Sequence, residues 1–318
     1  MKYNAPGIFT FIFISRSVQR RAALFAALLL AACASPDDAY VLWDSGGSSS
    51  ISGAGGSGGT GGVGGTSTTG DDSAPEMEKP PRYMYAVSDV YLFRMDVTTL
   101  GPGVVAEKVG EFKIDPDRMI DIAISTDGTI YGVTWNSGDF PSKLWTIDKD
   151  TAAATFISEL PGGANVGLTF MADGTLLGAD KEGRLFRIDP PTGEATDIGT
   201  WGNGLGASGD IVGTSDGKLF GFADSGGSAS EAINSLVEID PVTGAAAEVG
   251  PTGFDNLWGA AVWCGTFYAF RSDGDLLEID MKTGKGTMLA SKILGAQSGF
   301  SGAGVPVTLP GTAGGICP

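Results

Sequence analysis

Short apolar stretches separated by turn residues recur along the chain from residue 82 onward. In the third such repeat, the apolar stretches predict four strands, at 166–170, 175–179, 185–188 and 195–199. The Asp-Gly and Glu-Gly pairs between the first three strands supply the positive φ that tight hairpin turns require. Each repeat is therefore predicted to be a small antiparallel sheet of four short strands.

One pentapeptide marks all five repeats. It reads LFRMD at 92–96, LWTID at 144–148, LFRID at 185–189, LVEID at 236–240 and LLEID at 276–280. Its aspartates lie 52, 41, 51 and 40 residues apart, and a period of about 40 to 50 residues filled with short strands is typical of a propeller. We expect each aspartate at a turn corner, where its carboxylate accepts local backbone N–H bonds. One aspartate per blade would be too far from the next to share a metal.

The two ends of the repeat region predict how the ring closes. Only two strands, at 83–87 and 91–95, fit up to the end of the first signature, and one strand at about 302–308 is left over after the last repeat. A ring without exposed edges needs the C-terminal strand as the innermost strand of the first blade. The predicted fold is an all-β, five-bladed β-propeller closed by its C-terminal strand, over residues 82–318.

Two repeats carry a longer motif, LFRIDPPTGEATDIG at 185–199 and LVEIDPVTGAAAEVG at 236–250. This motif resembles a broad group of bacterial propellers whose blades read roughly L-Y-x-I-D-P-x-T-G-x-A-T-x-I-G. The resemblance covers about residues 82–309. It implies blade structure and says almost nothing of activity, because these residues form turns and core.

The first 32 residues are expected to be an export signal. They contain four basic residues, no acidic residue and an apolar run at 22–32, which is too short to span a bilayer. The run ends in LAAC at 30–33, which resembles the lipobox of bacterial lipoproteins. The resemblance implies a signal peptide over 1–32, acylation of Cys33 and, with Ala34 following it, an outer-membrane address. An ordinary cleavage site near Cys33 is the alternative.

Residues 33–81 are expected to be the lipidated N-terminus and a flexible tether. The segment 45–73 consists almost entirely of Gly, Ser and Thr, which cannot form a packed core. The propeller is then attached to the membrane through a lipid anchor and a linker.

The charge of the chain narrows its partners. The whole chain has a net charge of −17, and removal of a leader with four of the 20 basic and none of the 37 acidic residues leaves −21. That charge argues against nucleic acid and anionic lipid surfaces as partners. It allows cationic ligands, divalent ions, or an acidic surface that serves solubility alone.

The chain contains no histidine, which excludes His-dependent triads and imidazole-ligated metals. Propeller lactonases and quinoprotein dehydrogenases hold calcium or a quinone through carboxylates and amides, so this absence does not exclude them. Cys264 and Cys317 remain once Cys33 is acylated. In an exported chain two cysteines favour a disulfide, which would lock the closing strand to the fifth blade.

Aligning the repeats on their Asp-Gly turns places several polar residues near the starts of the innermost strands. These candidate funnel residues are Asp121, Asn165, Asp210, Asp255, Asn256 and Trp258. Such a ring could bind a cation or a sugar hydroxyl, or it could satisfy the backbone around a narrow axis. The segments 135–142 and 225–234 are the longer loops where a binding edge could be built.

These observations predict a membrane-anchored envelope lipoprotein that acts as a ligand-binding or protein-interaction module without catalysis. Envelope proteins or glycans are the expected partners, with no nucleic acid and no cofactor, although calcium is possible. The alternative is a calcium-dependent hydrolase or lactonase that uses Asp121, Asp210, Asp255 and Asn165 at the funnel.

Overall fold

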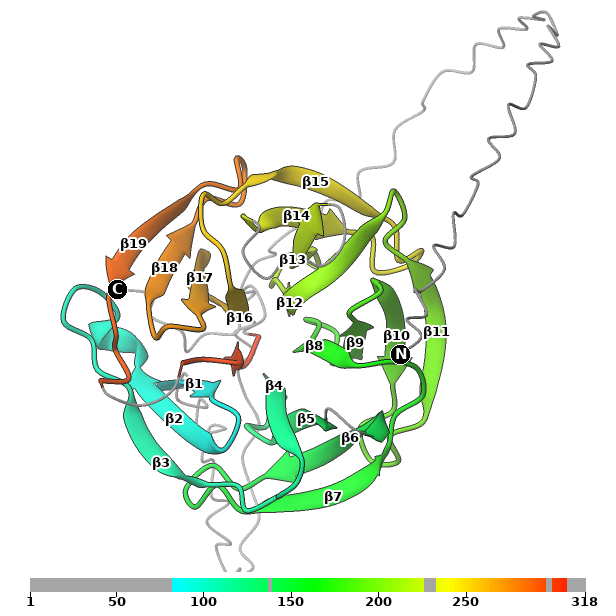
Figure 1. Ribbon diagram of the computed structural model, residues 1–318, viewed down its shortest axis with the longest axis horizontal. Helices are drawn as coiled ribbons and strands as arrows, with labels where there is room; N and C mark the ends of the chain where they lie inside the picture. Colours follow the sequence, from blue (N-terminus) through cyan, green and yellow to red (C-terminus); the bar gives the residue numbers. More distant parts are fainter. Residues whose placement is uncertain (1–81, 137–138, 226–232, 296–298, 308–318) are drawn as a thin grey trace, which may run out of the picture. The chain divides into compact units, whose positions relative to one another are not determined.

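The computed structural model describes residues 82–136, 139–225, 233–295 and 299–307 (Figure 1). The chain divides into two compact units, Met1–Gly70 and Asp71–Pro318, and every described residue belongs to the second. The described residues form strands and one 3₁₀ turn, η1 (Val97–Thr99), with no α-helix. The predicted signal peptide, Cys33 and the tether lie outside them. None of the described segments is a helix that is long and apolar enough to cross a membrane.

Five four-stranded antiparallel sheets form the blades. From the innermost to the outermost strand, blade 1 contains β20 (Gly302–Gly304), β1 (Tyr83–Val87), β2 (Tyr91–Asp96) and β3 (Glu107–Glu111). Blade 2 contains β4 (Arg118–Ile124), β5 (Ile130–Asn136), β6 (Asp139–Ile147) and β7 (Ala154–Glu159). Blade 3 contains β8 (Asn165–Phe170), β9 (Leu176–Asp180), β10 (Arg184–Ile188) and β11 (Ala195–Thr200).

The last two blades follow the same order. Blade 4 contains β12 (Leu205–Gly213), β13 (Leu219–Ser225), β14 (Ser235–Ile239) and β15 (Ala246–Pro251). Blade 5 contains β16 (Leu257–Trp263), β17 (Thr266–Arg271), β18 (Leu276–Ile279) and β19 (Gly286–Ala290). The innermost strands contact one another in the cyclic order β20, β4, β8, β12, β16, and β16 contacts β20 again (Figure 1).

The predicted closure is confirmed. The C-terminal strand β20 pairs antiparallel with β1, with Gly302 opposite Val87 and Gly304 opposite Tyr85. The strand is shorter than the expected 302–308, since it ends at Gly304. In blade 3 the four predicted strands agree with β8 to β11 to within one residue at each end.

The segment 135–142, expected to be a long loop, is mostly strand. β5 continues to Asn136 and β6 begins at Asp139, with Asn136 paired to Asp139. The expectation was wrong because the pairing between β5 and β6 continues past a register irregularity at residues 134–136 into the polar residues. Most of the other long segment, 225–234, lies outside the described residues.

The signature aspartates stand at the predicted turn corners. Asp240 Oδ1 accepts the Val242 N–H at 2.8 Å, and Asp280 Oδ1 accepts the Lys282 N–H at 2.8 Å. Asp96 and Asp148 accept backbone N–H groups of their own turns in the same way. These backbone hydrogen bonds are the main reason that the pKa values of Asp240 and Asp280 are lowered. The carboxylates therefore stabilise the turns.

The glycines of the repeat motif bring neighbouring blades together at the rim. A Cβ on Gly199 in blade 3 would lie 2.1 Å from the Thr243 carbonyl oxygen in blade 4, and one on Gly250 would lie 2.4 Å from the Thr283 oxygen in blade 5. Gly110 in blade 1 meets the Thr151 oxygen of blade 2 in the same way, at 2.5 Å. The motif thus encodes a contact with the next blade as well as a strand and a turn.

The hydrophobic core lies in layers between blades. Trp201 is 1% exposed and packs with apolar residues of blades 3 and 4. Phe267 of blade 5 makes edge contacts with Phe220 and Phe222 of blade 4, with ring centroids 6.3 and 5.7 Å apart. Edge-to-face contacts between aromatic rings are favourable, and these two hold blade 5 against blade 4.

We predict that Gly250→Ala lowers the free energy of unfolding by about 1–3 kcal/mol, because the new methyl group overlaps the backbone of the adjacent blade. Urea unfolding of the variant and the parent measures this difference. Gly163→Ala is the matched control, since its Cβ would meet only the end of the exposed Glu182 side chain. Equal stability of the two variants would contradict the proposed rim contact.

Candidate functional site

Two of the six candidate residues, Asp121 and Asp210, meet at the axis of the ring. Both are fully buried, on β4 and β12 respectively. Asp121 Oδ1 accepts the Ile122 N–H at 2.8 Å, and Asp121 Oδ2 accepts the Leu168 N–H of β8 at 2.6 Å. Asp210 Oδ2 accepts the Ala260 N–H of β16 at 2.6 Å.

Two further backbone N–H groups complete this set. The Ala303 N–H of β20 hydrogen bonds to Asp121, and the Ile211 N–H of β12 hydrogen bonds to Asp210. Each of the five innermost strands therefore contributes one backbone N–H to the two carboxyl groups. We call these two carboxyl groups and five N–H groups the hub.

Glycine makes room for the hub on the other strands. A Cβ on Gly302 would lie 2.4 Å from Asp121 Oδ1 and 2.5 Å from the Asp121 Cα. A Cβ on Gly167 would lie 2.9 Å from the backbone N of Ile211, and a Cβ on Gly259 would lie 2.8 Å from the carbonyl carbon of Gly302. Two aspartates and three glycines thus surround the axis at the level of the hub. Of these five residues, only the two aspartates place a side chain at the axis.

The hub strongly perturbs the ionisation of both carboxyl groups. Burial raises the pKa of Asp121 above its usual range, although the hydrogen bonds from Asp210 and from the backbone oppose that rise. Burial, followed by the charge of Asp121 and the hydrogen bond to it, raises the pKa of Asp210 well above its usual range. Asp210 Oδ1 accepts no hydrogen bond from an N–H group or hydroxyl of the described residues.

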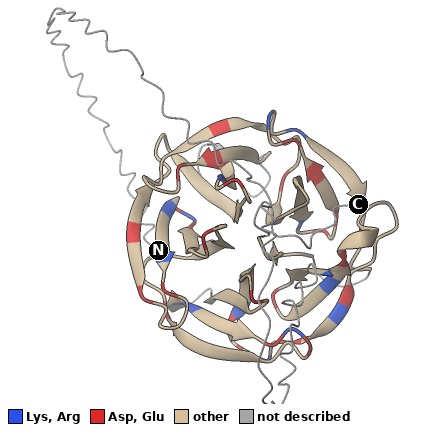
Figure 2. Ribbon diagram, turned by 180° about the vertical axis from the view of Figure 1, so that it is seen from behind, with Lys and Arg blue, Asp and Glu red and all other residues tan. Residues whose placement is uncertain are grey.

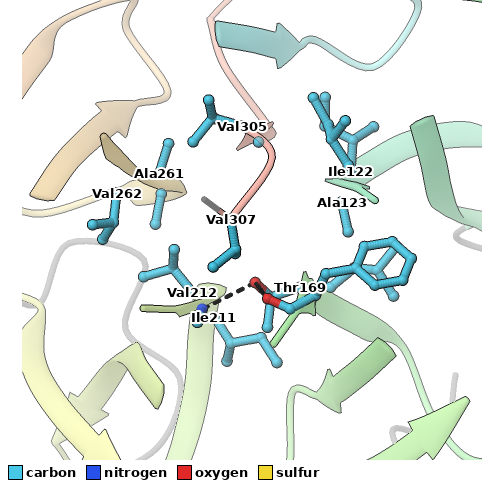
Figure 3. Close-up of a pocket in the computed structure, with 16 residues that line it drawn as sticks. Ile122, Ala123, Thr169, Ile211, Val212, Ala261, Val262, Val305 and Val307 are labelled. Atoms are coloured by element: carbon cyan, nitrogen blue, oxygen red, sulfur yellow. Dashed lines mark hydrogen bonds between the residues drawn. The ribbon is translucent and has the colours of Figure 1, made fainter. Parts of the chain in front are cut away.

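Beside the hub, the innermost strands line a narrow apolar channel (Figure 3). Its wall includes Ile122, Val212 and Val262, and Val305 and Val307 after β20 complete it. The Gly213 N–H donates to Thr169 Oγ1 there, at 3.0 Å. The free volume is about 10 Å³, which suits one water molecule. The axis is too narrow for a sugar.

Asn165 lies at the start of β8 and takes no part in the hub hydrogen bonds. It is fully buried, and its backbone N–H donates to Ser142 Oγ at 3.0 Å. Its side-chain oxygen and nitrogen have no hydrogen-bond partner among the described residues. We expected Asn165 to share one funnel with the two aspartates, but no hydrogen bond joins Asn165 to either of them in the described residues.

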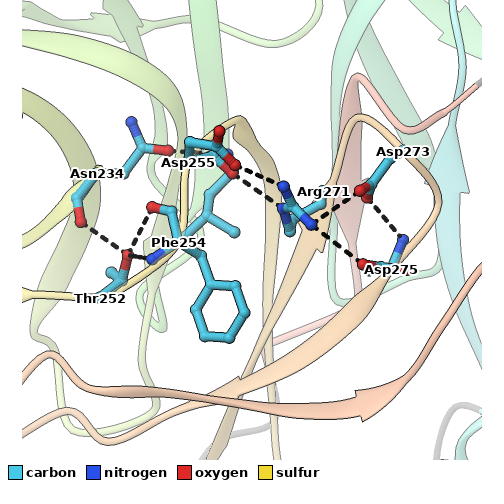
Figure 4. A network of polar contacts seen from close by, with 8 residues as sticks. Asn234, Thr252, Phe254, Asp255, Arg271, Asp273 and Asp275 are labelled. Carbon is cyan, nitrogen blue, oxygen red and sulfur yellow. Dashed lines mark hydrogen bonds and ion pairs between the residues drawn. The ribbon is translucent and has the colours of Figure 1, made fainter. Parts of the chain in front are cut away.

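Asp255 belongs to a separate cluster on blade 5, organised by Arg271 at the end of β17 (Figure 4). Arg271 Nη2 bonds Asp255 Oδ1 at 2.5 Å, and Arg271 Nη1 bonds Asp273 Oδ2 at 2.8 Å and Asp275 Oδ2 at 3.1 Å. The guanidinium is 19% exposed, whereas Asp255 and Asp273 are 34% and 46% exposed. Partial burial opposes the charge of Arg271, but the three carboxylates outweigh it and raise its pKa.

Asp255 lies on the connection from blade 4 to blade 5, and Asn234 holds that connection in place. The Asn234 carbonyl accepts the Thr252 hydroxyl at 2.7 Å, and Asn234 Oδ1 accepts the Leu257 N–H at 2.9 Å (Figure 4). Asn256 and Trp258 are half-buried on the same connection and the start of β16. The six candidates therefore do not form one ring. Asp121 and Asp210 meet at the axis, Asn165 takes no part in their hydrogen bonds, and the other three lie at the start of β16 or on the connection before it.

Sequence reasoning missed Arg271, Asp273, Asp275 and Asn234. The run RSDGD at 271–275 was a usable signal, because it adds two charged residues, Arg271 and Asp275, to the usual Asp-Gly turn. Asp and Glu are spread around the whole ring (Figure 2). On blade 1 the cations have partners: Arg94 pairs with Glu107 at 3.0 Å, and Lys108 Nζ lies 3.3 Å from the Tyr91 ring centroid.

The described residues contain no group of three or more Cys, Asp and Glu side chains arranged to hold a metal ion. Cys264 is half-buried beside the apolar cluster that includes Trp263 and Val305. Cys317 lies outside the described residues, so the disulfide between the two stays a prediction.

We predict that Arg271→Met lowers the free energy of unfolding by about 2 kcal/mol, because three carboxylates lose their shared cation while the apolar stem remains. High salt should recover part of the loss by screening the carboxylates from one another. Denaturant unfolding at two salt concentrations measures both effects. Arg187→Met, on the exposed face of β10, is the control, and an equal effect there would refute the role of the cluster.

Comparison with known proteins identifies no family and no particular activity. No protein-family model matches the chain, and no curated protein matches it. Among solved structures, a chain of a nidogen–laminin complex is 12% identical with a TM-score of 0.49, covering 72% of this chain and 99% of that one. The calcium-binding protein regucalcin from Agrobacterium tumefaciens is 17% identical with a TM-score of 0.43, covering 72% and 77%. An oligogalacturonate lyase in complex with manganese is 16% identical with a TM-score of 0.37, covering 66% and 62%. At these identities the likeness concerns the β-propeller fold alone.

Proposed function

We propose that the protein is a lipid-anchored propeller of the bacterial cell envelope that binds a ligand or a protein partner without catalysing a reaction. The leader, the LAAC sequence at 30–33 and the Gly-rich segment 45–73 support the anchor. The outer membrane is the favoured address because Ala34 follows Cys33. The Cys264–Cys317 disulfide is part of this proposal, and peptide mapping without reduction tests it.

One observation carries the choice of binding over catalysis. The carboxyl groups on the axis accept backbone N–H groups from all five innermost strands, and the adjacent channel has room for about one water molecule. Three of their four oxygens accept backbone N–H groups and the fourth is buried, which leaves little for a metal or a substrate. A partner is then expected at the rim.

The rim of blade 5 is the best candidate for that contact. Asp255 and Asp273 are partly exposed there and are held in place by Arg271. Trp258, half-buried close by in sequence, offers part of an aromatic surface. Fixed carboxylates and a partly exposed aromatic ring suit a glycan hydroxyl or a cationic group of a protein.

A binding screen tests this assignment. Full-length lipoprotein in detergent is applied to glycan, metabolite and envelope-protein panels, and each hit is measured again with Trp258→Ala. We expect the variant to weaken binding at least about tenfold, the equivalent of 1.4 kcal/mol. Phe156→Ala, on the exposed outer strand of blade 2, is the control and should bind as the parent does. Unchanged binding by Trp258→Ala would move the site elsewhere.

Cys33→Ser tests the anchor. We expect the variant to lose incorporation of labelled palmitate and to leave the membrane fraction, because no acylated thiol remains. The parent should fractionate with the outer membrane. Membrane retention of an unlabelled variant would contradict the lipoprotein assignment.

The alternative, a calcium-dependent hydrolase or lactonase, has a direct test. A ligand that binds only the folded state must stabilise it, so millimolar calcium would raise the melting temperature if the funnel carboxylates held the ion. We expect no such shift. A shift that disappears in Asp255→Asn would favour the calcium enzyme over the binding module.

A further inference from the structure

The hub has an imbalance of donors and acceptors. Three of the four carboxyl oxygens of Asp121 and Asp210 accept a backbone N–H at 2.6 to 2.8 Å. The fourth, Asp210 Oδ1, is buried and accepts none. The two carboxyl groups lie close enough to hydrogen bond to each other, yet ionised carboxylates are acceptors only. A hydrogen bond between two carboxyl groups needs a proton on one of them.

No cation nearby can take the place of that proton. Among the innermost strands, the only charged residue besides the pair is Arg118, whose guanidinium bonds Asp115 and the carbonyl oxygens of Pro116 and Asp117. The chain contains no histidine. Two unpaired negative charges in a buried apolar site would repel each other strongly.

The second strands of the blades bring no free charge to the hub either. Their charged residues, Asp180, Asp224 and Arg271, lie at or next to the strand ends, and each has a partner there. Asp180 pairs with Arg184 at 3.2 Å, Asp224 Oδ1 accepts Asn234 Nδ2 at 2.8 Å, and Arg271 bonds its three carboxylates.

We propose that the Asp121–Asp210 pair holds one proton at neutral pH, carried by Asp210 Oδ1 and donated to Asp121, and that its loss to solvent at alkaline pH loosens the closure of the ring. In this state Asp121 is a carboxylate that accepts three backbone N–H groups and one O–H. Asp210 is a neutral acid that accepts two backbone N–H groups. The proton is the missing donor of the hub.

The hub includes the closing strand, so loss of the proton should act there first. The Ala303 N–H of β20 hydrogen bonds to Asp121, and Gly302 packs directly on the same residue. β20 is also short, with three residues paired to β1. Repulsion between two carboxylates would therefore weaken the strand that holds blade 1 in the ring.

The sign of the pH effect follows from proton linkage. An acid whose pKa is raised on folding binds more protons in the folded state than in the unfolded state. Stability therefore falls as pH rises from the unfolded value near 4 toward the folded pKa of Asp210, which burial and the charge of Asp121 raise well above its usual range. The turn aspartates, such as Asp96 and Asp148, have lowered pKa values and lose their contribution only as pH falls below about 4. Between pH 5 and 8, the hub sets the trend.

The experiment is a comparison of full-length protein with Asp210→Asn across pH 5 to 9. The amide keeps the shape of the acid, donates to Asp121 without a titrating proton and still accepts the Ala260 N–H. We expect the folding equilibrium constant of the parent to fall by up to about tenfold per pH unit, while that of Asp210→Asn stays nearly constant and exceeds the parent at pH 9. Asp89→Asn, an exposed residue, is the control and should follow the parent.

A second readout keeps the proposal testable if Asp210→Asn does not fold. The infrared carbonyl band of a protonated carboxyl group should be present in the parent at pH 7 and disappear at alkaline pH. The protection factor of the Ala303 amide against hydrogen exchange should fall over the same range. Absence of the band at pH 7, or a parent whose stability rises from pH 5 to 9, would overturn the proposal.

Discussion

A propeller must satisfy the inner edge of its innermost strands, and the rest of this structure depends on how it does so. Each such strand turns backbone N–H groups toward the axis, and buried N–H groups without partners are strongly unfavourable. Here two aspartates accept one N–H from each of the five strands. Three glycines at the facing positions keep the axis open for those two side chains. One small polar group of atoms thus joins all five blades, including the blade completed by the C-terminal strand.

At the outer strands of the blades, one kind of contact is repeated from blade to blade. Glycines in β3, β11 and β15 allow the turn of the next blade to approach within contact of the backbone, and the signature aspartates shape those turns. The seam between blades 5 and 1 departs from this pattern, since Ala290 stands opposite Leu276 where blades 3 and 4 have glycine. At that seam the Ala106 N–H instead donates to the Ile293 carbonyl at 3.0 Å. The seam that closes the ring is therefore built from its own contacts.

The division between hub and rim bears on function. Residues that the blades share build turns, strands and contacts between blades, so they carry little information about a partner. Residues that differ between blades fall into two sets. Asp121 and Asp210 are used by the backbone at the axis, whereas Asp255 and Arg271 form a partly exposed cluster at one rim. The likeness to solved structures says nothing of activity, so the proposed binding role depends on this cluster and on the leader sequence.

By itself the sequence determined the strands, their grouping into five blades, the turn corners and the role of the last strand, because these follow from local periodicity, turn chemistry and the count of strands. The tertiary structure alone decided which distant polar residues meet. Asp121 and Asp210 stand at similar places in their repeats, but only ring closure shows that both reach one buried point, and that Asn165 does not share their hydrogen bonds. Arg271 and its three carboxylates belong to one turn and the strands beside it, yet their ion pairs depend on side-chain direction. Periodicity specifies the backbone, whereas contacts between side chains far apart in the chain depend on the packing of one blade on another.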